Sequence, residues 1–188
     1  MWESRRADVP NWKNDPVPLL LNQDSQHSDV LDDEHEEEYL KVRIEFTTPT
    51  DKPLALYACH CTECQHQSSS AHGITAIFPY FELPESVAAL AGTYTRDTLT
   101  GRQMECVFCK NCGARIFHRF RDLMPAPGEK PGPTATTNVK GGCLVGLDKE
   151  MMKGAVHIWT QHAIVDIPEG AERYEKEPPQ ANPLASKS

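Results

Sequence analysis

Seven cysteines constrain this chain more than any other feature, because six of them fall into two short clusters. The first cluster reads CHCTEC and spans residues 59–64, the second reads CVFCKNC and spans residues 106–112, and Cys143 stands alone. Cysteines spaced CxC and CxxC, in a chain whose first residues show no export signal, are typical of metal binding rather than of a disulfide framework. We therefore expect zinc (Zn²⁺) bound by thiolates.

Composition and charge exclude several other classes of protein. The opening residues, MWESRRADVPNWKNDPVPLL, carry charges and prolines where a secretion signal needs an apolar stretch, and no uncharged run approaches the ~20 apolar residues that span a bilayer. Lysine and arginine number 19 against 27 aspartates and glutamates, so the formal net charge of −8 would repel a nucleic-acid backbone. We expect a soluble, cytoplasmic protein that acts on a small molecule, without a nucleic-acid or membrane partner.

The chain divides into a central domain and two polar ends. Residues 1–38 are dotted with prolines and close on DVLDDEHEEE, in which seven of ten residues are acidic, so this segment is expected to be a flexible acidic arm. Residues 175–188 are equally polar and are expected to be a disordered tail. A zinc-binding β domain over residues 39–174 remains, which suits one domain of modest size.

Alternation of apolar and polar residues makes the expected fold mainly β. The alternation is clearest over residues 40–46 and 103–108, where one face of each strand would be buried. The expected buried sets are Leu40, Val42, Ile44 and Phe46, then Met104, Cys106 and Phe108. Shorter strands are expected over residues 54–58, 74–78, 115–120, 143–147 and 156–159. The predicted architecture is a set of small sheets around the CxCxxC and CxxC zinc knuckles.

Little regular structure other than strands is expected. Helical periodicity is limited to residues 86–91 and 149–152. Residues 122–142 contain four prolines and four glycines, so they are expected to form a long surface loop, either a lid or a dispensable insertion.

The first cysteine cluster follows directly on the expected strand 54–58. In extended backbone Cys59 and Cys61 project to the same face, and the CxxC step folds Cys64 back toward them, so three thiolates can converge on one ion. Zinc prefers a tetrahedron with sulfur at about 2.3 Å, and three protein ligands leave the fourth corner open, as in catalytic sites. Because three thiolates make zinc a poor Lewis acid, a thiol is a more natural fourth ligand than water, which favours sulfur chemistry.

The second cluster, CKNCG, has the sequence of a zinc knuckle. Its turn would point Cys109 and Cys112 inward, and Gly113 permits the left-handed backbone that such a turn needs. Two sulfurs are too few for a structural zinc site, which has four protein ligands. One alternative is therefore that the last two cysteines of the first cluster join Cys109 and Cys112 in a closed four-cysteine ribbon, which leaves Cys59 without a role.

Several motifs occur in order along residues 42–174: VRIEF, CHCTEC, the serines of residues 68–70, FCKNCGARIFHRF, GGCLVGLD and AVHIWTQHAIVDIP. In these motifs the chain resembles the glutathione-dependent formaldehyde-activating enzymes, a family that includes the centromere protein V type domains. The resemblance implies a mainly β fold and a lyase-type addition between glutathione and formaldehyde. It also implies that Cys59, Cys61 and Cys64 hold the zinc that meets the thiol, whereas Cys109 and Cys112 are half of a second, structural zinc site.

The chain departs from the family pattern at three places. The resemblance implies a further CxC ahead of VRIEF that supplies two structural ligands, but this chain reads EHEEEYLK there. The second zinc is therefore either lost or completed by other ligands such as Cys106, Cys143 or His35. Ser69 stands where the family has glycine, and residues 65–66 are Gln and His where it has basic residues, so the thiol could differ from glutathione. The C-terminal motifs resemble the fungal branch of the family, which is often found in specialised metabolism.

Hydroxyl and imidazole groups near the first cluster are the candidate catalytic groups. Ser70 could donate a hydrogen bond to a developing oxyanion, and His66 or His72 could relay a proton near neutral pH. His60 alternates away from the cysteines, so a supporting role or surface exposure is expected rather than ligation. Packing rather than catalytic roles are expected for Phe117, His118, Cys143, His157 and Trp159.

Two classes of function follow from these features. The first is a zinc-dependent lyase-type enzyme that acts at a carbon–sulfur or small carbonyl centre, with glutathione, another thiol or a specialised metabolite at the open zinc position. The second is a non-catalytic module in which zinc only staples short strands and the surface recruits another protein. We favour the enzyme, because Cys59 has no role in a closed ribbon and the acidic surface indicates no macromolecular target.

Overall fold

The structure, a computed structural model, describes residues 18–20 and 44–179, with side chains from residue 44 onward. Its strands are β1 (Pro18–Leu20), β2 (Glu45–Thr47), β3 (Ala55–Cys59), β4 (Gly73–Pro79), β5 (Ala91–Asp97), β6 (Gln103–Cys109), β7 (Arg115–Phe120), β8 (Thr136–Lys140) and β9 (Val156–Ile158). Its α-helices are α2 (Thr62–Ser68), α3 (Glu85–Ala88) and α4 (Lys149–Lys153), and its 3-10 helices are η1 (Arg121–Leu123), η2 (Gly141–Cys143) and η3 (Thr160–His162). The mainly β fold expected from the sequence is confirmed.

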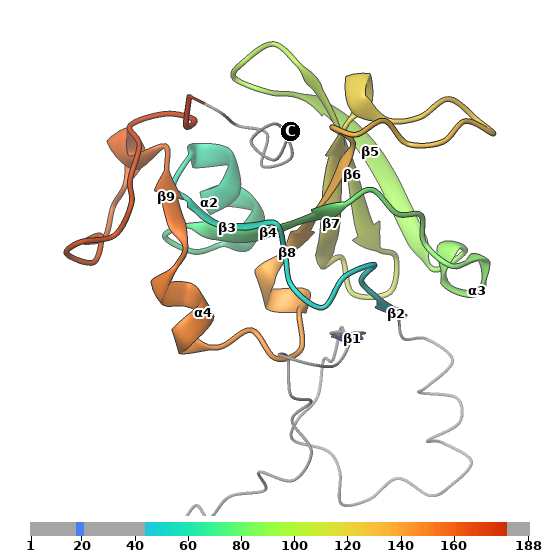
Figure 1. Cartoon of the computed structure of the whole chain (residues 1–188), viewed down its shortest axis with the longest axis horizontal. Helices are drawn as coiled ribbons and strands as arrows, with labels where there is room; N and C mark the ends of the chain where they lie inside the picture. Colours follow the sequence, from blue (N-terminus) through green and yellow to red (C-terminus); the bar gives the residue numbers. More distant parts are fainter. Residues whose placement is uncertain (1–17, 21–43, 180–188) are drawn as a thin grey trace, which may run out of the picture.

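Seven strands form one sheet in the order β5-β6-β7-β8-β4-β3-β9, and β1 pairs with β2 in a separate two-stranded ladder. Neighbours in the large sheet are antiparallel except β3 and β9, which run parallel. The sheet is strongly bent, so that β5 and β6 stand across the direction of β3 and β4 (Figure 1). This bend brings residues from both halves of the sheet around one cavity.

The two faces of the large sheet differ in what they cover. One face carries the apolar core: Leu56 of β3, Ala76 and Phe78 of β4, Val139 of β8, Phe117 of β7 and Val107 of β6. The opposite face lines the cavity with Tyr57, Cys59, Thr75, Ile77, Asn138, Lys140, His118, Phe120 and Met104. Because side chains alternate along a strand, the same strands supply both the stabilising core and the cavity wall.

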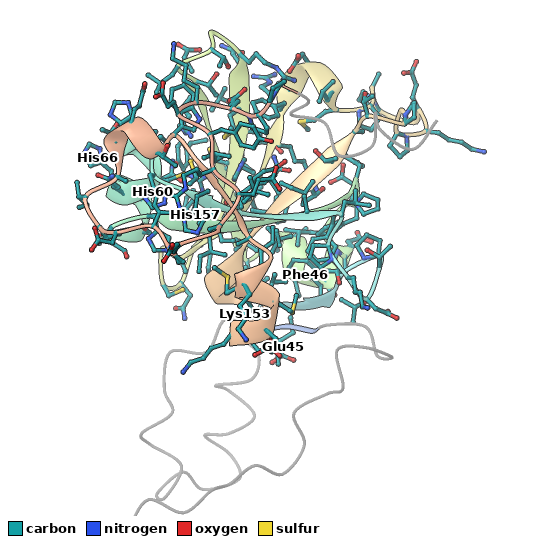
Figure 2. The ribbon with its side chains drawn as sticks, turned by 60° about the vertical axis from the view of Figure 1, so that its left-hand side comes forward. Glu45, Phe46, His60, His66, Lys153 and His157 are labelled. Atoms are coloured by element: carbon teal, nitrogen blue, oxygen red, sulfur yellow. The ribbon has the colours of Figure 1, made fainter. Side chains whose placement is uncertain are left out.

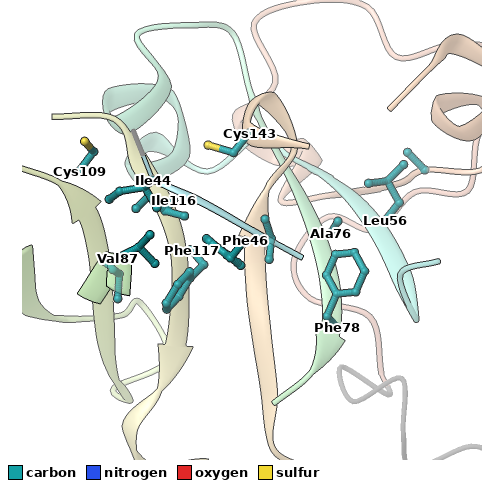
Figure 3. Close-up of a cluster of buried hydrophobic side chains, with 13 residues drawn as sticks. Ile44, Phe46, Leu56, Ala76, Phe78, Val87, Cys109, Ile116, Phe117 and Cys143 are labelled. Carbon is teal, nitrogen blue, oxygen red and sulfur yellow. The ribbon is translucent and has the colours of Figure 1, made fainter. Parts of the chain in front are cut away.

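Strand β2 closes the core from outside the large sheet (Figure 3). The ring of Phe46 lies 5.5 Å from that of Phe81 and 6.4 Å from that of Phe117, centroid to centroid, while Ile44 and Ile116 are both fully buried. Burial of side chains of this size stabilises the fold by roughly 1.5–3 kcal/mol each. The predicted alternation is confirmed over residues 44–46, whereas residues 40–43 lie outside the described part of the chain.

Most expected elements are present within one or two residues of their predicted bounds. The segments predicted at 54–58, 74–78, 103–108, 115–120 and 156–159 are strands β3, β4, β6, β7 and β9. The helical segments predicted at 86–91 and 149–152 overlap α3 and α4, although α3 ends at residue 88.

Two expectations about the C-terminal half are wrong. Residues 122–142 are not a loop throughout, because Thr136–Lys140 is β8, an inner strand of the sheet. The prolines and glycines that precede its TTNVK sequence favoured the loop prediction for the whole segment. Residues 143–147 do not form a strand. Instead Cys143 ends a 3-10 helix, and Gly146 has a φ of 88°, which turns the chain toward α4.

Strand β6 is covered on both faces, which the predicted alternation did not foresee. Val107 was expected on the polar face but is buried, because this face packs in the apolar core together with Cys109. The register with β7 shifts between Val107 and Phe108, which marks a bulge, and Phe108 is half-buried. Phe108 lies over Gly92 instead, where a Cβ would come within 2.5 Å of its ring.

The two polar ends are described only in part. Residues 18–20 of the expected arm pair with β2, and Lys176 of the expected tail accepts a hydrogen bond from the backbone N of Trp159 at 3.1 Å. The remaining residues before 44 and those after 179 lie outside the described part of the chain, so the predicted boundaries stay predictions. Within the described residues, no helix has the length and apolar character needed to cross a bilayer.

Candidate metal centre

Three cysteines converge where β3 ends and α2 begins; we call them the triad. Cys59 is the last residue of β3, Cys61 precedes α2, and Cys64 lies in the first turn of the helix. Their Sγ atoms all lie within 4.8 Å of one another, and those of Cys59 and Cys61 are 3.5 Å apart. Each residue is at most 8% exposed. The convergence predicted from the CxCxxC spacing is therefore present.

Two local features bring Cys64 back to the strand. Cys61 is the N-cap of α2, and its Sγ accepts a hydrogen bond from the backbone N of Cys64 at 3.4 Å. Gly73 lies opposite Cys59 in β4, and a Cβ at residue 73 would come within 3.2 Å of the Cβ of Cys64. The absence of a side chain at Gly73 therefore lets the helix pack closely enough for the third sulfur to reach the other two.

Hydrogen bonds among the thiols make one of them acidic. Bonds from Cys59 and Cys64 to the sulfur of Cys61 lower the pKa of Cys61 to about 2. The pKa of Cys59 is raised by its hydrogen bonds to the other two thiols and by burial. For Cys64 the hydrogen bond with Cys59 lowers the pKa, but the bond with Cys61 and burial outweigh it, so the pKa is raised. Without metal, the triad holds one thiolate and two thiols near neutral pH.

The donor set of the triad fits Zn²⁺. In a zinc tetrahedron with zinc–sulfur distances of about 2.3 Å the sulfurs lie about 3.8 Å apart, close to the separations found here. Three thiolates around a dication leave one net negative charge, and the nearby Lys140 interacts electrostatically with both Cys64 and Cys59. Among the described residues, no further Cys, His, Asp or Glu joins the three within this spacing. A fourth tetrahedral position is therefore left for an external ligand.

The triad forms part of the wall of a cavity of about 630 Å³. The cavity is bounded by the concave face of the sheet, by the β5–β6 connection with Leu99 and Arg102, and by Trp159 and residues 177–179. A volume of this size is typical of pockets that bind small molecules. The thiols thus lie at the edge of a space that can hold a substrate.

This cavity has a cationic wall that was not predicted from the sequence. Arg96 and Lys140 line it together with His118 and Asn138, which face each other in neighbouring strands. Burial lowers the pKa of Lys140. Burial, helped by the charge of Lys140, holds the pKa of His118 well below its usual value, so this imidazole is neutral. Arg96 lies in β5 and Lys140 in β8, the two strands of the large sheet that the sequence pattern did not reveal.

Trp159 covers the triad from the side of β9. It packs against the three cysteines and lines the cavity, so the expectation that it is a core residue is only half right. Its φ of 57° is left-handed, which is rare for a bulky residue and costs of the order of 1–3 kcal/mol. Hydrogen bonds to the carbonyl oxygens of Lys176 and Tyr174, each 3.1 Å long, hold the backbone of Trp159 and Thr160 in place.

His60, which lies between two cysteines of the triad in the sequence, is close to His157 (Figure 2). His60 is 1% exposed, and its Nε2 lies 3.0 Å from Nδ1 of His157. Burial is the main cause that lowers the pKa of both. Gln65 donates from Nε2 to the carbonyl oxygens of His60 and His162 at 2.8 and 2.9 Å, which ties α2 to the sheet. Of the two alternatives expected for His60, surface exposure is wrong, and a supporting role stays a prediction. His157 is a packing residue as expected.

The three predicted catalytic residues lie outside the cavity wall. Ser70 and His66 are exposed, at the end of α2 and on its outer surface. His72 is half-buried and its ring lies 5.1 Å from that of His60. Their catalytic roles stay predictions, whereas Lys140 does line the cavity and interacts electrostatically with Cys64 and Cys59.

The second cysteine cluster lies at the end of β6, far along the sheet order from the triad. Cys109 is buried in the apolar core, Cys112 packs against it, and Gly113 has the predicted left-handed backbone with a φ of 75°. Cys143 lies at the same end of the core as Cys109 (Figure 3), and burial and the charge of Cys112 raise its pKa to about 12. Within the described residues these cysteines do not form a group with metal-ligand spacing, so a second zinc stays a prediction.

The cysteine arrangement has a counterpart in a known family. The family model of the glutathione-dependent formaldehyde-activating enzymes matches residues 40–162, which is more than half of the chain. The chain belongs to this family. The match includes both cysteine clusters and all strands from β2 to β9. No curated protein matches the chain.

Membership in the family does not identify the substrate. The resemblance inferred from the motifs is confirmed, and the family is one of enzymes named for a thiol and a small aldehyde. The closed four-cysteine ribbon is inconsistent with the fold, because Cys61 and Cys64 lie with Cys59 and not with Cys109 and Cys112.

Proposed function

We propose that this chain is a zinc-dependent, lyase-type enzyme that forms or breaks a carbon–sulfur bond between a thiol and a small carbonyl compound. The position of the triad carries this proposal. Three thiols with metal-ligand spacing lie in the wall of a cavity of about 630 Å³ and lack a fourth ligand among the described residues. Glutathione is the first candidate thiol because of the family, and a thiol-bearing specialised metabolite is the second.

In this proposal Cys59, Cys61 and Cys64 hold the zinc. When bound, zinc would supply an electrophilic centre that favours the ionised form of a substrate thiol. In the addition direction, the S–H bond of the thiol and the π bond of the carbonyl break, and a C–S bond and an O–H bond form. Atoms and electrons balance without any further reactant.

The residues of the cavity have separate tasks in this reaction. Lys140 interacts with two of the triad cysteines and is largely enclosed, so its ammonium is placed to stabilise negative charge on the carbonyl oxygen. Trp159 packs over the triad and limits the access of water to the sulfurs. The proton that moves from sulfur to oxygen could pass through His66, His72 or Ser70 as predicted from the sequence, although none of them lines the cavity.

The test is the rate at which formaldehyde and glutathione exchange with their adduct, measured by exchange NMR with the zinc-loaded, full-length protein. The wild type should accelerate this exchange above the uncatalysed rate. Lys140→Met should keep zinc but slow the exchange by about 10–1000-fold, whereas Cys143→Ala, a matched change of a buried residue remote from the triad, should leave the rate unchanged. Ser70→Ala measures whether the predicted hydroxyl contributes.

The competing class is the zinc-stapled binding module. If no thiol in a panel of glutathione, cysteine and 2-mercaptoethanol gives acceleration with formaldehyde, and the zinc does not take up added thiol, the lyase proposal is wrong. The cavity favours the enzyme, because a structural zinc site has four protein ligands and does not need a substrate-sized space beside them.

A further inference from the structure

The chain that follows β9 returns along that strand and is bonded to it (Figure 1). Tyr174 donates from its backbone N to the carbonyl oxygen of His157 at 2.8 Å, and Trp159 donates from its backbone N to the carbonyl oxygen of Lys176 at 3.1 Å. Thr160 donates from its backbone N and from Oγ1 to the carbonyl oxygen of Tyr174 at 3.1 and 3.0 Å. The returning chain is therefore anchored to β9 and its following turn as far as Lys176.

Beyond Lys176 the anchoring ends, but the chain goes on lining the cavity. Glu177, Pro178 and Pro179 all line it; we call these three residues the strap. In the described part of the chain no hydrogen bond or ion pair holds any residue of the strap. Two successive prolines have a fixed φ and no backbone N–H, so the strap is stiff and leaves few donors unpaired when it moves.

Two observations place the strap at the part of the cavity that contains the triad. The strap follows directly on Lys176, which is bonded to Trp159, and the side chain of Trp159 packs against the three cysteines. Burial, followed by the charges of two glutamates that include Glu177, raises the pKa of Tyr57. Tyr57 precedes Cys59 by two residues in β3 and lines the cavity with it. The strap therefore lies close to the sulfurs.

The strap also separates the cavity from solvent. Glu177 and Pro179 are exposed while they line the cavity, and Pro178 is half-buried. The triad cysteines behind it are at most 8% exposed. Among the described residues that line the cavity, only the strap lies beyond residue 162, where the family match ends. Membership in the family therefore does not account for this part of the wall.

We propose that the strap is a hinged lid, which turns about Lys176 and controls how fast a ligand reaches the triad. Because the strap is held at one end only, its opening breaks packing contacts but no hydrogen bond of the described residues. Lids of this kind exclude water when closed and admit substrate when open. The inference rests on the proposed function, since it takes the incoming ligand to be a thiol that meets zinc at the triad.

The test is the rate at which the zinc-loaded protein transfers its zinc to the chelator 4-(2-pyridylazo)resorcinol, because the chelator must reach the metal. The phase of the transfer that is absent from Cys59→Ser reports the triad. A chain that ends at Lys176 lacks the strap and should transfer this zinc at least about tenfold faster than the full-length protein. A chain that ends at Pro179 is the matched control, because it loses residues 180–188 but keeps the strap, and its rate should be unchanged. Zinc affinity at equilibrium should be the same in all three chains, since their zinc ligands are the same.

A second variant keeps the length and the charge of the chain. Replacing both prolines, Pro178→Gly with Pro179→Gly, loosens the strap without removing it and should raise the transfer rate by about threefold. This variant decides the question if the chain that ends at Lys176 has a lower melting temperature or a weaker zinc affinity. An unchanged transfer rate in the folded glycine variant would then overturn the lid.

The remaining outcomes separate the lid from the proposed function. Equal transfer rates in the full-length protein and both shortened chains overturn the lid. Faster transfer from both shortened chains also overturns it, because residues 180–188 would then be the cover. Faster transfer only from the chain that ends at Lys176, with a zinc that takes up no added glutathione, supports the lid and contradicts the lyase proposal. Uptake of glutathione with equal transfer rates supports the lyase proposal and overturns the lid.

Discussion

The two cysteine clusters use the same CxxC spacing in opposite surroundings. The triad opens on a cavity of about 630 Å³ and keeps its three sulfurs within 4.8 Å of one another. Cys109 and Cys112 instead pack with the apolar core at the end of β6, and no third described residue completes a ligand group there. Spacing alone therefore does not distinguish the two clusters, whereas the space beside the sulfurs does.

The difference has a cause in the chain around each cluster. In the triad the extra cysteine at residue 59 ends a strand of the cavity face, and Gly73 lets α2 pack against it. In the second cluster the CxxC turn joins β6 to β7, and Cys109 points to the core face. The first arrangement places three sulfurs beside the cavity, whereas the second places its sulfurs against the apolar core.

The largest expected effect is the loss of zinc from the triad. Cys59→Ser puts a hard hydroxyl on a soft ion and should lower the bound zinc of the triad below about a tenth of an equivalent. The sheet should still fold, because apolar burial on its other face is untouched. Elemental analysis, far-ultraviolet circular dichroism and melting curves test this, with Cys112→Ser as the matched variant. If Cys59→Ser unfolds the protein as badly as Cys112→Ser, the two clusters do not differ in role.

The second effect is the pH dependence of zinc affinity. Thiols with raised pKa values, Cys59 and Cys64, hold their protons at neutral pH and must release them to zinc, whereas Cys61, with a pKa of about 2, is already ionised. Affinity should therefore rise with pH, by about 100-fold per pH unit between about pH 6 and pH 8. Competition with a chelator of known affinity measures the slope. A rise of about 1000-fold per unit would mean that all three thiols are protonated in the free protein.

A smaller effect on zinc affinity is expected from a side chain at residue 73, where glycine lets α2 pack closely against β4. Gly73→Ala places a Cβ 3.2 Å from the Cβ of Cys64 and 3.6 Å from its Sγ, which pushes the third ligand away. Zinc affinity should fall by about tenfold, as for other changes that disturb ligand orientation. Gly142→Ala is the control, since a Cβ there meets nothing within 4 Å. Equal zinc affinities of the two variants in a chelator competition would show that Gly73 does not set the position of Cys64.

The smallest effect concerns the end of the core near the second cluster. Cys143 is 5% exposed, its pKa is raised to about 12, and its Sγ lies 3.3 Å from the carbonyl oxygen of Arg115. Cys143→Ala should lower the free energy of unfolding by about 1 kcal/mol without changing the zinc content. Urea unfolding and elemental analysis check both. A loss of zinc in this variant would contradict this expectation. It would show that Cys143 is a zinc ligand and that the second cluster, like the triad, binds metal.

The metal centre could be predicted from the sequence because its geometry is local. Residues 59–64 place three sulfurs through the alternation of one strand and one helical turn, and no distant residue is needed. A strand with clear alternation, Gln103–Cys109, could also be predicted from the sequence to within one residue. The left-handed backbone predicted at Gly113, after the second cysteine cluster, is also present in the structure.

The cationic wall could not be predicted, because it is assembled from segments with weak patterns. Strand β8 follows a run rich in proline and glycine, and β5 reads AGTYTRD, with few apolar residues, since it lies at the edge of the sheet. Arg96 and Lys140 come together only because the sheet bends and orders these strands around one cavity. The predicted catalytic residues were chosen by nearness in sequence to the triad, but the turn after α2 carries Ser70 to the surface.

The most direct test of the central claim is zinc K-edge X-ray absorption of the zinc-loaded protein before and after glutathione is added. An open triad predicts about three sulfurs at about 2.3 Å and one lighter ligand before addition, and about four sulfurs afterwards. Four sulfur ligands in the wild type before addition, with no change on addition, would show a closed structural site and contradict the account.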